Sequence, residues 1–238
     1  MPELERTVSR LADQAVHNSF RLFLTSKPCG FFPVSILQTA TKITNEPPKG
    51  LIPNILKSLN NIEAENLLEC EKPEIFKRML FGLCFFHSVA QERQKYGSIG
   101  WNVRYMFNDS DLDSSITMLR TFLNTEEETI PWDAIRHMIG NVNYGGRVTE
   151  EMDLRLLMNL LGIYINPQIF EPNYKFSQLG IYHVPENNTI EGYITYLNSL
   201  PMIEAPEIFG LGDNSNIKLQ KGESDNILKT ALLMQPRD

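Results

Sequence analysis

Cysteine is scarce in this sequence. The 238 residues include three cysteines, Cys29, Cys70 and Cys84, whose spacing matches neither a metal-binding motif nor a set of disulfide pairs. Cys84 lies inside an apolar run, where a free cysteine serves as a small hydrophobic side chain. We therefore expect a reducing compartment and no metal centre.

Long hydrophobic runs and clusters of basic residues are also absent. No apolar run approaches the length of a transmembrane helix, and the first residues, MPELERTVSRLADQ, lack the basic-then-apolar pattern of a secretory signal. The formal net charge is −7, and no Lys/Arg cluster is present that could neutralise a row of phosphates. These absences predict a soluble protein that is neither secreted nor embedded in a membrane and that does not bind nucleic acid.

The sequence has no phosphate-binding loop. Such a loop needs the spacing G-x-x-x-x-G-K-[ST] after a strand, so that backbone N–H groups and a lysine surround the phosphates. The nearest candidate, Pro48-Lys49-Gly50, has the wrong order and is not followed by Ser or Thr. We expect this chain to bind no nucleotide or other cofactor of its own.

The most informative segment that is present covers residues 72–102. Pro73 suits the first turn of a helix, and Gly97 and Gly100 suit its end. From residue 79 to residue 86 every position is apolar except for one glycine, so no face is left for water. The pattern predicts a helix that is buried on all sides.

Two polar features of this helix need an interpretation. Cys84 and His87 lie one helical turn apart and could act as a nucleophile and its base, or as half of a metal site. No second Cys/His pair has suitable spacing, which favours a packed cysteine and a hydrogen-bonded histidine. Gln91, Glu92 and Arg93 are expected to form the solvated end of the same helix.

Most of the remaining chain predicts amphipathic helices. Apolar spacing and capping residues place them at residues 2–17, 110–124, 131–139, 150–164, 190–200 and 224–234, with an ordered but irregular segment over 166–185. Residues 20–25 and 34–44 are apolar or β-branched and predict two strands.

The sequence Pro47-Pro48-Lys49-Gly50 marks a domain boundary. Residues 1–46 then form a partial α/β piece of one helix and two strands, and residues 47–238 form a mainly α-helical domain. Two strands and one helix cannot make a stable sheet alone, so we expect further strands to be missing from the first piece.

Three alternating acids, Asp109, Asp111 and Asp113, resemble the start of a calcium-binding loop. That loop needs Gly at its sixth position and Glu at its twelfth, where this chain has Ser114 and Arg120. The acids are better interpreted as charges at a helix N-terminus. Because no Ser/His/Asp set or carboxylate pair has a geometric argument either, no catalytic, cofactor-binding or metal-ligating residue is assigned.

Seven segments of the sequence resemble dynein heavy chains, in the order and spacing of that family. They are FRLFLTSKP (20–28), FPVSILQTATKITNEPPKGL (32–51), LFGLCFFHSVAQERQKYGSIGWN (80–102), FNDSDL (107–112), NYGGRVT (143–149), KFSQLGIYHVP (175–185) and EIFGLGDNSNI (207–217). NEPPKG and LFGLCFFH look closer to axonemal than to cytoplasmic dyneins.

The resemblance implies a place in the sixth AAA+ module of the motor ring. Residues 1–46 would be the last part of its large α/β subdomain and residues 47–238 its helical lid. Thr25 and Ser26 fall where AAA+ modules carry a polar sensor, but the sixth module of this family has lost its nucleotide, so they are not assigned as catalytic. Gly212 stands where the family usually has His, which leaves any role of that His without a counterpart here.

The function that the resemblance implies is that of an ATP-driven motor moving toward microtubule minus ends in cilia. ATP and magnesium would be bound in other modules, and this chain would be a structural and relay element of the ring. Implied partners are the other AAA+ modules and the rest of the heavy chain and, through the parent motor, intermediate chains, light chains and microtubules. The implied location is the cytoplasm, its cytoskeleton and the ciliary axoneme.

Two alternatives to a motor segment remain. The first is a stand-alone, non-motor module that docks on dynein or other axonemal components. The second is an independent hydrolase that uses Cys84 and His87.

Overall fold

A computed structural model describes residues 2–13, 17–26, 32–43, 48–62, 70–125, 129–172, 174–186 and 188–235. By its internal contacts the chain divides into two compact units, Met1–Pro47 and Pro48–Asp238.

The described residues of the first unit include two helices, α1 (Pro2–Asp13) and α2 (Val34–Thr39). The hydroxyl of Ser35 donates a hydrogen bond to the carboxylate of Glu5, which ties α2 to α1. Between the helices, residues 20–26 have no regular secondary structure and are exposed.

The two predicted strands are wrong. Residues 20–25 form no strand, and residues 34–39 of the second predicted strand form α2, while Thr44 lies outside the described residues. A strand is stable only when neighbouring strands bond to its edges, and the described part of this unit offers no second strand. In α2 the backbone instead bonds locally, as in the 3.2 Å hydrogen bond from Leu37 N to the Pro33 carbonyl.

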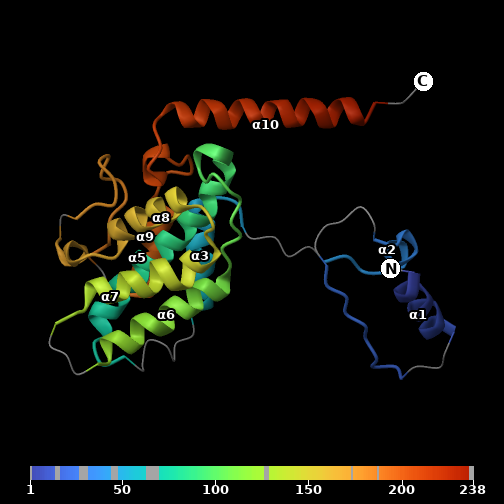
Figure 1. Cartoon of the computed structure of the whole chain (residues 1–238), viewed down its shortest axis with the longest axis horizontal. Helices are drawn as coiled ribbons and strands as arrows, with labels where there is room; N and C mark the ends of the chain where they lie inside the picture. Colours follow the sequence, from blue (N-terminus) through green and yellow to red (C-terminus); the bar gives the residue numbers. More distant parts are fainter. Residues whose placement is uncertain are drawn as a thin grey trace. The chain divides into compact units, whose positions relative to one another are not determined.

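In the part of the second unit that the structure describes, the named secondary-structure elements are all helices (Figure 1). In chain order these are α3 (Leu51–Asn61), α5 (Pro73–Glu92), the 3-10 helix η1 (Arg93–Ile99), α6 (Asp109–Leu123), α7 (Trp132–Arg136), the π-helical η2 (His137–Tyr144), η3 (Gly145–Arg147), α8 (Glu151–Tyr164), η4 (Pro167–Phe170), α9 (Ile190–Ser199), η5 (Pro206–Phe209) and α10 (Asn214–Leu233). The predicted mainly α fold is thus confirmed.

Helix α5 is the centre of this unit. Pro73 occupies its first turn, where a missing N–H leaves no hydrogen bond unmade. Every residue from Met79 to Ala90 is buried, because α3, α6 and α8 pack around the helix (Figure 1). The predicted all-round burial is therefore confirmed.

Gly82 allows the end of α8 to lie directly against the backbone of α5. A Cβ atom at this position would lie 2.6 Å from the Tyr164 carbonyl oxygen and 2.8 Å from Cδ1 of Ile169. Any larger side chain would push the end of α8 away, so glycine is required by packing.

Aromatic side chains fill the space between α5 and the irregular segment that follows α8. The ring of Phe176, from that segment, lies 4.9 Å from the ring of Tyr164 and 5.2 Å from the ring of Phe85. Phe176 N donates to the Tyr182 carbonyl at 2.8 Å. Residues 166–172 and 174–185 thus lie over the helices, as predicted.

Helix boundaries agree with the sequence where local patterns are strong. The helices predicted over 110–124, 150–164 and 190–200 correspond to α6, α8 and α9 within one residue at each end. Helix α3 falls in the region expected to be helical, but no local pattern predicts its bounds. Helix α7 is shorter than the predicted helix over 131–139, because the chain continues as the π-helical η2.

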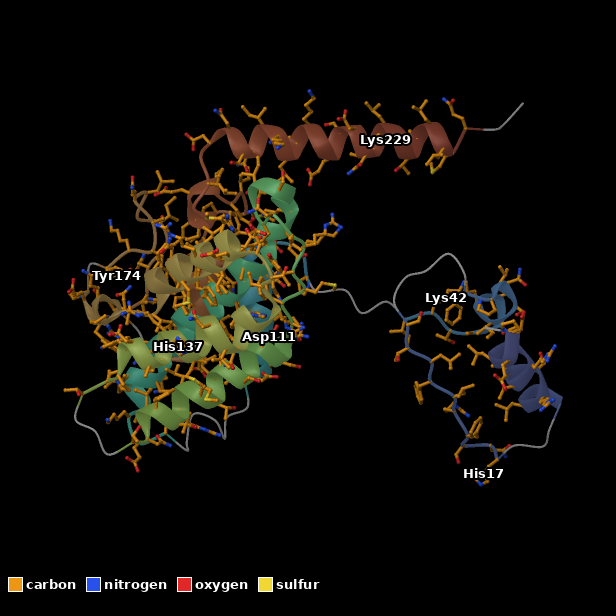
Figure 2. All side chains as sticks on the ribbon, in the orientation of Figure 1. His17, Lys42, Asp111, His137, Tyr174 and Lys229 are labelled. Atoms are coloured by element: carbon orange, nitrogen blue, oxygen red, sulfur yellow. The ribbon has the colours of Figure 1, made fainter. Side chains whose placement is uncertain are left out.

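Helix α10 begins ten residues before the helix predicted over 224–234. Among the described residues, its contacts with the rest of the unit lie near its start: Ser215 is buried, Leu219 packs against the core, and Tyr96 Oη donates to Oδ1 of Asn216 at 3.2 Å. From Gly222 to Gln235 every residue is exposed, and side chains around Lys229 project on both sides of the ribbon (Figure 2). In the part of the chain that the structure describes, no helix is long and apolar enough to cross a membrane.

Replacing Phe85 with alanine should lower the free energy of unfolding by about 3 to 5 kcal/mol, because it empties a fully buried position. Urea denaturation followed by circular dichroism measures this loss. Met152→Ala on the exposed face of α8 is the control and should change stability by less than about 0.5 kcal/mol. A loss below about 1 kcal/mol for Phe85→Ala would contradict the central position of α5.

Candidate functional site at the end of helix α5

Arg93 lies where α5 passes into η1, and its side chain is only 2% exposed. Its Nε and Nη2 atoms donate to the Gly100 carbonyl at 3.1 and 2.8 Å, and Nη1 donates to the Phe209 carbonyl. The guanidinium carbon also lies 5.2 Å from the centre of the Trp101 ring. One side chain therefore joins the end of α5, the loop after η1, and η5.

Burial lowers the pKa of Arg93 to about 10, while the negative charge of Asp153 acts in the opposite direction. The guanidinium therefore stays protonated at neutral pH, and its hydrogen bonds are charge-assisted. Removing it would leave two buried carbonyl groups without these donors.

The expectation that Gln91, Glu92 and Arg93 form a solvated helix end is wrong for Arg93, which is buried. Gln91 and Glu92 are partly buried, and Gln91 Nε2 donates to the Phe107 carbonyl at 3.1 Å. The physical reason is that other protein groups supply the hydrogen bonds that water would otherwise supply: backbone carbonyls accept from Gln91 and Arg93, and Gly50 N donates to Glu92. The polar residues in the sequence predicted contact with water, but these side chains form hydrogen bonds with other parts of the protein.

Glu92 and Glu204 both meet the start of α3. Glu92 accepts a hydrogen bond from Gly50 N at 2.9 Å, and Glu204 accepts one from Leu51 N. Lys95 pairs with both carboxylates, at 3.4 Å from Glu92 Oε2 and in closer contact with Glu204. Each of these charged groups at the end of α5 thus has an oppositely charged partner within the protein.

Asp153 plays a comparable part at the start of α8. It is 3% exposed and accepts hydrogen bonds from the backbone N atoms of Asn102 and Val103 and, at 2.9 Å, from Tyr105 Oη. The sequence placed this acid in the first turn of a helix, where it does lie. The sequence could not predict that Asp153 holds the loop after η1, because its partners Asn102 and Val103 lie 51 and 50 residues away.

Cys84 and His87 are packed in the core, as the sequence analysis favoured. Burial raises the pKa of the Cys84 thiol to about 12, so it is not a thiolate at neutral pH. His87 Nδ1 is 2.7 Å from Tyr144 Oη, and burial lowers the pKa of His87 to about 4. The structure therefore argues against a nucleophile and base pair at these residues.

The alternating acids are helix N-terminal charges, as predicted. Asp109 and Asp111 lie in the first turn of α6, where Asp111 accepts from Asn108 N at 2.9 Å and pairs with Arg147 Nε at 2.9 Å. Asp109 pairs with Lys57 at 2.7 Å. Among the described residues, no group of three His, Cys, Asp or Glu side chains is arranged to hold a metal ion.

The other sequence positions singled out lie at the surface. Thr25 and Ser26 are exposed in the segment between α1 and α2, and Gly212 is exposed before α10. Lys49, at the candidate phosphate-binding position, is exposed at the start of the second unit, while its neighbour Gly50 contacts Glu92. The polar groups at the end of α5 thus bond to one another and form a structural junction between segments of the chain.

Comparisons with known proteins agree with this structural character. Residues 76–215 match the family described as the dynein heavy chain AAA lid domain, and residues 1–44 match the dynein heavy chain region D6 P-loop domain. The first match identifies residues 76–215, within the second unit, as an AAA lid domain, and we refer to this unit as the lid. Despite the second description, residues 1–44 contain no G-x-x-x-x-G-K-[ST] sequence.

Curated relatives match the full length of the chain. Dynein axonemal heavy chain 1 of Rattus norvegicus is 44% identical over 238 residues, and dynein axonemal heavy chain 3 of Mus musculus is 43% identical over 241. Dynein axonemal heavy chain 6 of Homo sapiens is 40% identical over 237. The chain belongs to the dynein heavy chain family, and it spans 5 to 6% of the length of these relatives.

The burial of His87 predicts a pH-dependent stability. Its pKa is about 4 in the folded chain and about 6.5 when unfolded, so the unfolded state binds more protons between these values. This contribution to stability is complete above pH 6.5 and is lost as the pH falls toward 4. His87→Gln should remove about 2 to 3 kcal/mol of the difference in unfolding free energy between pH 7 and pH 4.5.

Urea denaturation at the two pH values measures this difference. His137→Gln changes an exposed histidine and should keep the wild-type pH dependence. If the stability of His87→Gln falls with pH in parallel with the wild type, the buried histidine is not the source.

Proposed function

We propose that this chain is a segment of the heavy chain of an ATP-driven, minus-end-directed microtubule motor of cilia. Within that motor it acts as a structural and relay module of the AAA+ ring. The observation that carries the proposal is the match of the whole chain, at 40 to 44% identity, to axonemal dynein heavy chains. The internal bonding of Arg93, Glu92 and Asp153 supports a load-transmitting role.

We further propose that this module binds no nucleotide and that ATP and magnesium act in other modules of the motor. The sequence supports this, because no segment has the Gly-rich spacing and lysine that cradle phosphates. The direct partners are then the neighbouring modules of the ring and the rest of the heavy chain. Intermediate chains, light chains and microtubules are partners of the parent motor, in the cytoskeleton of the axoneme.

Calorimetric titration of the 238-residue chain with ATP and magnesium tests the nucleotide proposal. We expect no binding heat at micromolar to hundred-micromolar ATP, because the backbone cradle for phosphates is missing. A dissociation constant in the micromolar range would refute this part of the proposal.

The size of the protein in cells tests the motor proposal. An antibody against residues 100–130 should detect, in extracts of isolated cilia, a band far above the 27.3 kDa of this chain. A band near 27.3 kDa as the sole product would instead favour the stand-alone docking module. A matched antibody against an axonemal tubulin verifies that cilia were enriched.

A further inference from the structure

The first turn of α3 is fixed by residues far away in sequence. The first N–H groups of a helix lack partners within the helix, and α3 has no side-chain cap at Gly50. Carboxylates fill this role from two other elements: Glu92, on α5, accepts from Gly50 N, and Glu204, between α9 and η5, accepts from Leu51 N. The start of α3 is thus held from two sides.

Asn54 extends this hold to the residue at which the second unit begins. Its side-chain nitrogen lies 2.8 Å from each of three acceptors, the Pro48 carbonyl, the Gly50 carbonyl and Glu92 Oε1. Gly50 itself has φ +108°, a conformation that favours glycine, and a Cβ there would lie 3.3 Å from Glu204 Oε1. The chain therefore enters the lid through a conformation that these side chains define.

Lys95 pairs with both carboxylates and offsets one of their two negative charges. Its ammonium group pairs with both Glu92 and Glu204 and lies 4.6 Å from the centre of the Phe209 ring. The two glutamate side chains are each 12% exposed, so water screens their mutual repulsion poorly and a shared cation is needed. We call Asn54, Glu92, Lys95 and Glu204 the entry latch.

The four side chains differ in how firmly they are supported. Asn54, Glu92 and Lys95 belong to α3, α5 and η1, whereas Glu204 lies in the connection between α9 and η5. Its neighbours Met202 and Ile203 are 96% and 84% exposed, so few buried contacts oppose movement of this connection. Glu204 is therefore the member of the latch that can open without disturbing the core.

We propose that the entry latch is a two-state coupling device. When Glu204 is bonded to Leu51 N and Lys95, residues 48–51 move as one body with the lid. When these bonds are broken, residues 48–51 become a hinge next to the boundary of the first unit. The proposal rests on the relay function proposed above and deepens it by naming the residues that couple the incoming chain to the lid.

Limited trypsin digestion of the 238-residue chain tests the latch, because the Lys49–Gly50 bond lies beside it. Glu204→Ala removes both the acceptor for Leu51 N and a partner of Lys95, and should raise the cleavage rate at Lys49 by about tenfold or more, as expected for loss of a charge-assisted hydrogen bond. Glu204→Gln keeps an acceptor and should show a smaller increase. Mass spectrometry follows each site separately.

Two controls separate latch opening from general unfolding. Glu151→Gln replaces an exposed glutamate of α8 and should cleave at the wild-type rate. Cleavage after the exposed Lys42 and Lys229 should not change in Glu204→Ala. Wild-type cleavage at Lys49 in Glu204→Ala, or an equal acceleration at all three lysines, would overturn the latch. Neither result depends on ATP or on a ciliary motor, so failure here leaves the proposed function to its own tests.

Discussion

A helix that is apolar on every face can meet water only at its ends, and this constraint shapes the whole lid. Along α5 the residues from Met79 to Ala90 are buried, so every neighbouring element must present an apolar surface to it. Gly82 brings the end of α8 within contact of the α5 backbone, and Phe176 covers Phe85 from the irregular segment. The positions of α3, α6 and α8 follow from the face of α5 that each of them covers.

Where α5 ends, polar bonding replaces apolar packing as the organising interaction. Arg93 binds carbonyl oxygens of two segments, and Glu92 and Lys95 reach the start of α3 and Glu204. Breaking one member of such a buried network leaves its partners unsatisfied, so the bonded arrangement is stabilised by all of its members together. The lid therefore has a rigid apolar middle and a polar end at which several segments meet.

Local patterns in the sequence predicted the parts of this fold that depend on local interactions. Helices α6, α8 and α9 have clear apolar spacing, and the continuous apolar run of α5 correctly predicted the burial of Cys84 and His87. The burial of Arg93 was not predictable, because its Phe209 partner lies 116 residues away. The strand expected over residues 34–44 failed for a related reason: strands need partners that a local pattern does not supply.

The attachment of α10 has a mechanical consequence. The helix contacts the lid through its first turns, at Ser215 and Asn216, beside the polar end of α5, and is exposed from Gly222 onward. Its twenty residues make a rod about 30 Å long, so a tilt of about 10° at the base would move its far end by about 5 Å. A small movement of η1 that tilts the base of α10 would therefore displace the exposed C-terminal end of the helix much more than the base, where Asn216 contacts Tyr96.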